Sequence, residues 1–500
     1  GIRTTSYFHN QIGILTETIG NPTPVEIPFV LDMQLPRADV PNPIQPRTFY
    51  FREAIEYSIT NNMAILDIAS KRHEDFLYNM YKMAKNAIDK GNRDNWTIHP
   101  KRIEAARQAI EAAQGRTEAG ENVGPRGGRG GGGGGRGGAP IAVFNNVLHD
   151  PKMRDPRGFI LPSDQPDFLT ATKFVNTLIK AGVVAQRATA PFTVAGKQYP
   201  AGSYVFKAAQ PFRAHLMDMF EPQDHPDDIP YPGGAPRPPY DVTGYNIAYS
   251  MGITFDRILD AFDGPFEKIP DLVAVAPGKV AAAPSGGGYL VSHEVNDAFV
   301  AVNRLLKAGE DVYWLKSAVS ANGHQYPVGT MYVGAKASTL PILQKLATDK
   351  GLSFDAIASK PAGDSMKLRP VRIGLWDQYG GSMPSGWTRW LFEQFEFPFE
   401  VVYPSTLDAG NLNAKYDVLI FVDGAIPLRD GVAGGGGGGG GGFGGQPAAD
   451  SIPAEFRGWL GRTTVAKTVP EVKKFAENGG TVITIGSSTA LGYHLGLPIR

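Results

Sequence analysis

The apolar pattern at the start of the chain predicts a short buried strand. Residues 7–20 have the sequence YFHNQIGILTETIG, which is rich in apolar and β-forming residues. Ile12, Ile14 and Leu15 are the aliphatic residues at its centre. We expect the strand to stop at residues 21–24, where two prolines remove backbone donors and restrict the residues before them. Glu17 is its one carboxylate. Because burying an unpaired carboxylate is costly, Glu17 is either a solvated strand-end residue or a functional group.

Helical spacing replaces this pattern after a proline-dotted loop at residues 25–47. Apolar residues recur at intervals close to the helical period through residues 51–69 and again through residues 76–88. The sequence therefore predicts two helices. The methionines and tyrosines of residues 76–83 favour a packed helix face over a ligand-binding box.

An internal repeat fills the middle of the chain. The segment FVNTLIKAG ends at Gly182 and its counterpart AVNRLLKAG ends at Gly309. The segment GKQYPAGSYVF starts at Gly196 and its counterpart GHQYPVGTMYV starts at Gly323. The two offsets, 309 minus 182 and 323 minus 196, are both 127 residues. Agreement in spacing and in residue type indicates a duplication.

Each copy of the repeat predicts the order strand, helix, strand, hairpin. The predicted strands and helices are 158–161, 168–181 and 183–187 in the first copy, and 288–291, 295–308 and 311–315 in the second. A strand-helix-strand unit favours a parallel sheet. The Tyr-Pro-x-Gly motifs that begin at Tyr199 and Tyr326 fit tight turns, and their recurrence favours a structural role for both tyrosines.

The last part of the chain predicts a doubly wound parallel sheet, because strands alternate with helices. The expected strands are 371–376, 399–403, 418–422 and 482–485, and the expected helices are 387–395, with Ser385 as its N-cap, and 470–478. The glycine-rich loop after the first of these strands could bind an anion on its backbone donors, and the candidate residues are Gly380, Gly381 and Ser382. A purely structural loop is the alternative.

The amino-acid composition excludes several classes of functional site and partner. The charges of the 49 basic and 49 acidic residues cancel, so the chain has no net positive charge that would attract nucleic acid. Cysteine is absent, which excludes disulfides, thiolate zinc sites and thiol nucleophiles. No apolar run is long enough for a membrane span. The Gly/Arg-rich residues 115–140 could bind RNA, but their few arginines favour a disordered linker, and we expect no nucleic-acid partner.

A metal-like pattern runs from the end of the first repeat copy into the stretch between the two copies. Two histidines are each followed three residues later by an aspartate. The four candidate ligands are His215, Asp218, His225 and Asp228. Imidazole and carboxylate groups could gather a divalent metal. The alternative is that the pattern belongs to an acidic, proline-rich loop without a metal.

The opening segment GIRTTSYFHNQIGILTETIG resembles the last core strand of the zinc carboxypeptidases, the carboxypeptidase A-like metallopeptidases. The matching residues are Thr16 and Glu17. The resemblance implies that Glu17 takes a proton from zinc-bound water, whose pKa zinc lowers towards about 7, and passes it to the leaving amine. None of the nine histidines starts the family's His-x-x-Glu motif, so the resemblance places the zinc ligands upstream of Gly1.

On this resemblance the chain is interpreted as the C-terminal portion of a large bacterial zinc carboxypeptidase. That implies a zinc cofactor, peptide or protein substrates, and a secreted or periplasmic location. The alternative is a non-catalytic α/β binding or scaffold protein in which Glu17 is structural.

Three later segments resemble the class I glutamine amidotransferase-like, flavodoxin-type fold. They are RIGLWDQYGGSMPSGWTRWLF, YDVLIFVDGA and FAENGGTVITIGSS. Active amidotransferases use a cysteine nucleophile, which this chain lacks, so the resemblance implies a degenerate domain. Ser487 and Ser488 lie at a comparable strand end without a G-x-S-x-G elbow.

The expected fold class is α/β and multidomain. The expected regions are 1–114 as the end of a carboxypeptidase sheet, 115–140 as linker, 141–366 as a duplicated α/β region with copies at about 157–220 and 287–350, and 367–500 as the flavodoxin-like domain with a glycine-rich insertion at 431–447.

Overall fold

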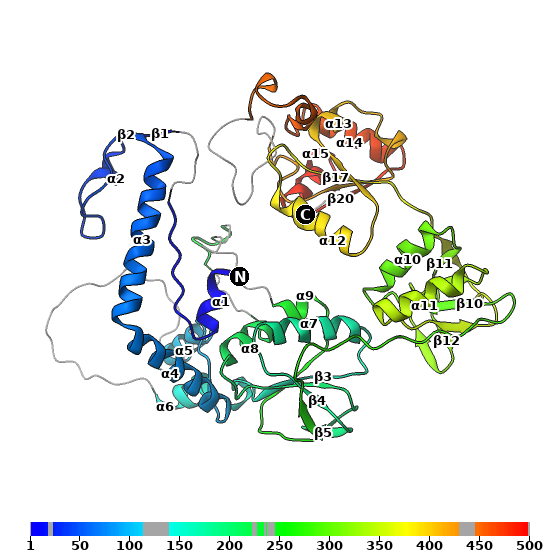
Figure 1. Ribbon diagram of the computed structural model, residues 1–500, viewed down its shortest axis with the longest axis horizontal. Helices are drawn as coiled ribbons and strands as arrows, with labels where there is room; N and C mark the ends of the chain where they lie inside the picture. Colours follow the sequence, from blue (N-terminus) through cyan, green and yellow to red (C-terminus); the bar gives the residue numbers. More distant parts are fainter. Residues whose placement is uncertain are drawn as a thin grey trace. The chain divides into compact units, whose positions relative to one another are not determined.

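The computed structural model describes residues 2–18, 24–113, 140–222, 228–234, 237, 246–429 and 446–498 (Figure 1). It contains two compact units, Gly1–Ala274 and Val275–Arg500. Helices and several sheets are mixed along the chain, so the predicted α/β class is confirmed. The expected linker and glycine-rich insertion fall almost entirely outside the described residues. Within the described residues, no helix is both long and apolar enough to cross a membrane.

The predicted opening strand is wrong. The chain starts with the helix α1 (Ile2–Phe8), which ends where Asn10 adopts a left-handed backbone with φ of 59°. Residues 11–18 follow without helix or strand, and the aliphatic side chains of this stretch are more than half exposed. A β-forming composition yields a strand only where a neighbouring strand supplies hydrogen bonds. No strand among the described residues pairs with this stretch.

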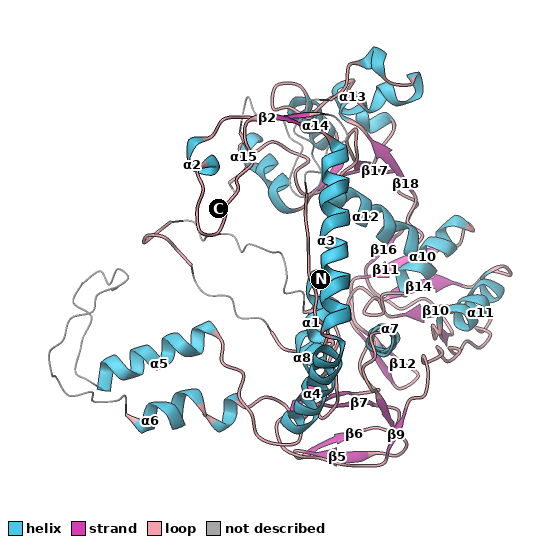
Figure 2. Ribbon diagram, turned by 60° about the vertical axis from the view of Figure 1, so that its left-hand side comes forward, coloured by secondary structure: helices cyan, strands magenta, loops and turns pink. Residues whose placement is uncertain are grey.

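The helices predicted from residues 51–69 and 76–88 are confirmed as α3 (Phe51–Lys71) and α4 (His73–Gly91) (Figure 2). The Glu53 carboxylate accepts the Tyr50 N–H and closes the start of α3. Other elements before residue 154 are β1 (Val25–Ile27), α2 (Leu31–Gln34), β2 (Arg47–Phe49), α5 (Pro100–Ala113), α6 (Ile141–Val143), η1 (Phe144–Leu148) and η2 (Pro151–Met153). Strands β1 and β2 form a two-stranded antiparallel sheet.

The first repeat forms a five-stranded sheet in the order β8-β3-β7-β4-β9. Its strands are β3 (Gly158–Leu161), β4 (Gln186–Ala188), β7 (Tyr204–Lys207), β8 (Asp256–Ile258) and β9 (Phe266–Lys268). The helix α7 (Phe168–Lys180) buries its apolar side against this sheet, with Phe174, Val175 and Leu178 fully buried. The further elements are the hairpin β5 (Phe192–Val194) and β6 (Lys197–Tyr199) and the helices α8 (Arg213–Phe220) and α9 (Ile247–Ser250).

The second repeat builds the same sheet in the order β15-β10-β14-β11-β16. Its elements are β10 (Gly288–Val291), α10 (Ala298–Lys307), β11 (Val312–Leu315), β12 (Val319–Ala321), β13 (His324–Tyr326), β14 (Met331–Gly334), α11 (Thr339–Lys350), β15 (Asp355–Ile357) and β16 (Ser365–Lys367). The matching strand orders support the duplication inferred from the sequence.

The parallel sheet predicted for the repeats is wrong. Every pair of neighbouring strands in both sheets is antiparallel. The strand that follows the hairpin, β7 or β14, inserts between the two strands flanking the helix. Those two strands run in the same direction but do not pair, because each forms its hydrogen bonds with the inserted strand.

The last sheet is parallel, as predicted, with the order β18-β17-β19-β20. Its strands are β17 (Ile373–Trp376), β18 (Phe399–Val402), β19 (Val418–Phe421) and β20 (Thr481–Thr484). Its helices are α12 (Met383–Gln394), α13 (Pro404–Asp408), η3 (Leu412–Ala414), η4 (Ala449–Ser451), η5 (Ala454–Trp459), α14 (Thr468–Glu477), η6 (Gly486–Ala490) and α15 (Leu491–His494). The predicted N-cap of α12 is corrected: Ser382 caps the helix, and its hydroxyl accepts the Ser385 N–H, because the helix starts four residues earlier than expected.

Candidate ligand-binding site

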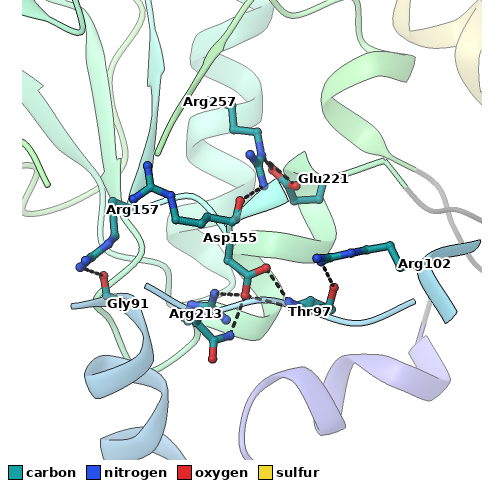
Figure 3. Close-up of polar contacts among 10 residues, drawn as sticks. Gly91, Thr97, Arg102, Asp155, Arg157, Arg213, Glu221 and Arg257 are labelled. Atoms are coloured by element: carbon teal, nitrogen blue, oxygen red, sulfur yellow. Dashed lines mark hydrogen bonds and ion pairs between the residues drawn. The ribbon is translucent and has the colours of Figure 1, made fainter. Parts of the chain in front are cut away.

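Asp155 is a buried carboxylate that joins three segments of the first unit (Figure 3). Its oxygens accept hydrogen bonds from the Asn95 amide at 2.8 Å, from the Thr97 N–H and hydroxyl at 2.8 and 3.0 Å, and from the Arg213 guanidinium at 2.8 Å. Burial acts to raise the pKa of Asp155, but these hydrogen bonds outweigh it and hold the pKa below its usual value. Asp155 is therefore an anion at neutral pH.

Local structure brings these groups together. Asn95 and Thr97 lie in the connection between α4 and α5, Asp155 lies between η2 and β3, and Arg213 begins α8. The Asp155 N–H also donates to the Asn95 carbonyl at 2.9 Å, which fixes the two connections side by side. The carboxylate thus fastens the helical segment of this unit to its sheet.

Arg102 extends the network from the opposite side. It lies in the first turn of α5 with 5% of its surface exposed. Its guanidinium donates to the Thr97 carbonyl at 3.2 Å and to the Val147 carbonyl at 3.1 Å, and it also bonds the Leu148 carbonyl. Its Nε has no hydrogen-bond partner, and within the described residues it forms no ion pair.

A second ion pair lies close to the network (Figure 3). Arg257 Nε donates to both carboxylate oxygens of Glu221, at 2.8 and 3.0 Å. The same guanidinium donates to the backbone carbonyl of Arg154, the residue before Asp155, at 2.6 Å. Arg154 in turn pairs with Asp94 at 3.0 Å, and this arginine holds the pKa of Asp94 below its usual range.

Several of these groups, among them Arg102, Asp155 and Arg257, line a cavity of about 690 Å³. Its wall combines charged side chains with apolar ones, and its lining includes Phe8, Thr97, His99, Arg102, Lys152, Met153, Asp155, Arg213, Met217, Asp218, Glu221, Pro222, Tyr249 and Arg257. A smaller cavity of about 260 Å³ shares Glu221, Pro222, Tyr249 and Arg257 with it. The larger volume is in the range of small-molecule sites. Because Asp155 and Glu221 are both engaged by arginine, this arrangement is suited to binding a ligand rather than to proton transfer.

Glu17 lies apart from any catalytic cluster that the described residues form. It is exposed in the irregular stretch 11–18, and so is Thr16. No group of three or more histidine, cysteine, aspartate or glutamate side chains that could hold a metal ion occurs within the described part of the chain. The described residues therefore do not fit a bound zinc ion, and any zinc would need ligands from elsewhere.

The four-residue metal candidate is not assembled by the described residues. His215 is buried in α8, with its ring 4.4 Å from the ring of His9, and burial first and then His9 lower the pKa of His215 to about 4. Asp218 lines the cavity and has an interaction of its own. Asp228 pairs with Arg237 at 3.9 Å, whereas His225 lies outside the described residues.

The candidate anion loop lies at the carboxyl end of β17. Gly380 and Gly381 have φ angles of 84° and 81°, the left-handed region that glycine adopts most easily. Ser382 uses its hydroxyl to cap α12. The buried Asp377 precedes this loop, and burial raises its pKa although Arg389 lies 3.7 Å away. A buried carboxyl group beside the loop weighs against anion binding there, and the anion site stays a prediction.

Sequence reasoning missed the cavity residues. Asp155 and Arg213 are 58 positions apart, and Asp155 and Thr97 are also 58 positions apart. No local motif links such distant residues, so only the fold reveals their meeting. Comparison with protein-family models, curated proteins and solved structures found no match to this chain.

Proposed function

We propose that this chain is the C-terminal portion of a zinc carboxypeptidase and contributes Glu17 as the group that accepts and returns a proton. The sequence match at Thr16 and Glu17 suggests the role. The observation that carries it furthest is the exposed apolar surface of the first region, where Ile12, Ile14 and Leu15 are 58%, 63% and 55% exposed.

The same exposure continues along α3. Ile55, Ile59, Met63 and Leu66 follow one another at helical spacing and are 45%, 52%, 63% and 63% exposed. The predicted packed face of α4 is also open, with Leu77 and Tyr81 each 62% exposed. Apolar surface of this extent marks an interaction site. A peptidase core outside these 500 residues would cover it and would supply the strand that pairs with residues 11–18.

The zinc belongs to that core in this proposal. When bound, zinc would supply Lewis-acid activation of the attacking water. Peptide or protein substrates and a secreted or periplasmic location follow from the same proposal. We further propose that the last domain is a flavodoxin-like, degenerate amidotransferase-type domain. Its strand order, second-first-third-fourth, is that of flavodoxin-like sheets, and it lacks the cysteine nucleophile.

The second candidate is a non-catalytic α/β binding or scaffold protein. It is favoured by a specific observation: the described residues gather buried charges around a cavity rather than around Glu17.

Metal content separates the two candidates. The chain of residues 1–500 is expected to hold no stoichiometric zinc and to hydrolyse no C-terminal peptide bond, as measured by elemental analysis and amino-acid release. A longer protein from the same gene should hold one zinc and release C-terminal amino acids. Zinc binding and hydrolysis by residues 1–500 alone would show that the metal site has been misplaced. A longer protein without zinc and without hydrolysis would support the scaffold.

A further inference from the structure

The wall of the 690 Å³ cavity carries a positive charge that no acidic side chain of the wall neutralises. Asp155 is neutralised by Arg213 at 2.8 Å, and Glu221 is neutralised by Arg257 at 2.8 Å. The third lining acid, Asp218, already engages another group of the protein. The guanidinium of Arg102, by contrast, is held by backbone carbonyls alone.

A buried guanidinium without an anionic partner is energetically costly. Carbonyl oxygens satisfy part of its hydrogen-bonding capacity, but they bring no counter-charge, and its Nε is unused. The exposed ammonium of Lys152 adds a second positive charge to the lining. The cavity therefore favours a ligand that carries negative charge.

The position of Arg102 is fixed by the same network that orders the cavity wall. The Thr97 carbonyl accepts a hydrogen bond from the Arg102 guanidinium, and the Thr97 N–H donates one to the Asp155 carboxylate (Figure 3). Thr97 therefore helps to set the positions of both charged side chains. Asp155 in turn holds Arg213. A site preorganised in this way loses little conformational entropy when a ligand binds.

The rest of the lining defines the body of the ligand. Met153, Met217 and Tyr249 present thioether and aromatic surface to the cavity. Flexible methionines and a tyrosine suit an apolar group of variable shape. A carboxylate brings the counter-charge that the carbonyls around Arg102 lack, which a neutral group does not.

We propose that this cavity binds a small organic carboxylate with an apolar body, with Arg102 as its principal counter-charge. The proposal does not depend on Glu17 or on zinc, so its failure and that of the peptidase proposal are distinguishable.

Benzoate is the probe, and isothermal titration on the intact chain is the measurement. Benzoate should bind saturably with one site, and benzyl alcohol, its neutral counterpart, should bind at least about tenfold more weakly, because charge-assisted hydrogen bonds contribute most of the discrimination. Inorganic phosphate should bind more weakly than benzoate. Absence of saturable benzoate binding, or tighter binding of phosphate, would overturn the assignment.

Two variants locate the site. Arg102→Gln removes the counter-charge and should weaken benzoate binding by about tenfold or more. Its matched control is Arg107→Gln, on the same helix but 69% exposed, which should change the affinity by less than about twofold.

Because Arg102 also bonds three carbonyls, its loss could unfold the region, and a second variant keeps it in place. Met153→Glu adds a carboxylate to the half-exposed part of the wall and should repel benzoate to a similar degree. Benzoate affinity unchanged in Met153→Glu, with circular dichroism like that of the parent, would rule out this cavity as the site.

Discussion

At the residue scale, the roles of single side chains depend on partners that are distant in sequence. Thr97, Asp155 and Arg213 form one hydrogen-bonded group although long stretches of chain separate them. Hydrophobic periodicity reports on residues within a few positions of one another. It therefore predicts helices and strands but not contacts between residues that are distant in sequence. A local motif suggests a role for Glu17, and that role stays a prediction, whereas no local signal points to Arg102.

His215 illustrates how burial changes the pKa of a side chain. Burial, followed by the charge of His9, lowers the pKa of His215 from its ordinary value of 6.5 to about 4. The unfolded chain takes up a proton as pH falls through about 6.5, whereas the folded chain does so only near 4. The contribution of neutral His215 to stability is therefore complete above about 6.5 and is lost as pH falls from there towards 4.

Replacement of this histidine should flatten the pH dependence of folding. The fall of the pKa from 6.5 to about 4 corresponds to about 3 kcal/mol at 1.36 kcal/mol per unit. In His215→Leu, the free energy of unfolding from urea titrations should fall less between pH 7 and pH 4 than in the parent protein. The control is His73→Leu, an exposed histidine in α4. Equal slopes for His215→Leu and the parent would contradict the assignment.

At the element scale, most helices and strands lie within a few residues of their predicted positions. The strands at 158–161 and 288–291 match the prediction at both ends. The pairing of the strands was not predictable in the same way, because the strand that inserts after each hairpin is specified by contacts across the sheet. The strand predicted for the opening segment is wrong because its composition suits a strand but no strand among the described residues pairs with it.

The recurring hairpin tyrosines attach each hairpin to its sheet. The Tyr326 hydroxyl donates to the Asp355 carboxylate at 2.7 Å, on the edge strand β15. Burial, and then a hydrogen bond to Asp256 on β8, raise the pKa of Tyr199 in the first copy. The two aspartates, like the two tyrosines, occupy equivalent places in the two sheets. The structural role predicted from their recurrence agrees with these contacts.

Tyr326→Phe and Tyr199→Phe should each lower the free energy of unfolding by about 1 kcal/mol, because each removes one hydrogen bond and leaves a carboxylate with one partner fewer. Urea unfolding measures this. Tyr78→Phe is a suitable control, since Tyr78 is 58% exposed on α4 and its loss should change stability by less than about 0.5 kcal/mol. If both hairpin variants behaved like this control, the tyrosines would not anchor the hairpins.

At the scale of the whole molecule, the chain combines well-packed sheet modules with a helical region that leaves apolar surface open. The described residues between β3 and α15 supply large buried clusters around Phe159 and Leu375 and a smaller one around Leu290. The first region instead exposes aliphatic side chains in the stretch 11–18 and on α3. Such a contrast within one chain is physically sensible if a further folded body covers the first region.

The function proposed for the whole molecule rests on one carboxylate in that open region. A base that accepts and returns a proton is needed for turnover but not for holding a metal. Replacing its carboxylate by an amide keeps its size and removes its basicity. Glu56→Gln, on the exposed side of α3, is the matched control.

The most direct measurement is peptide hydrolysis, with and without Glu17→Gln, by the longer zinc-binding protein that the proposal calls for. The account predicts that turnover falls by at least about a hundredfold, that zinc content is unchanged, and that Glu56→Gln retains full activity. Full activity in Glu17→Gln would contradict the assignment of Glu17, and loss of zinc in that variant would show that Glu17 binds the metal instead of serving as the base.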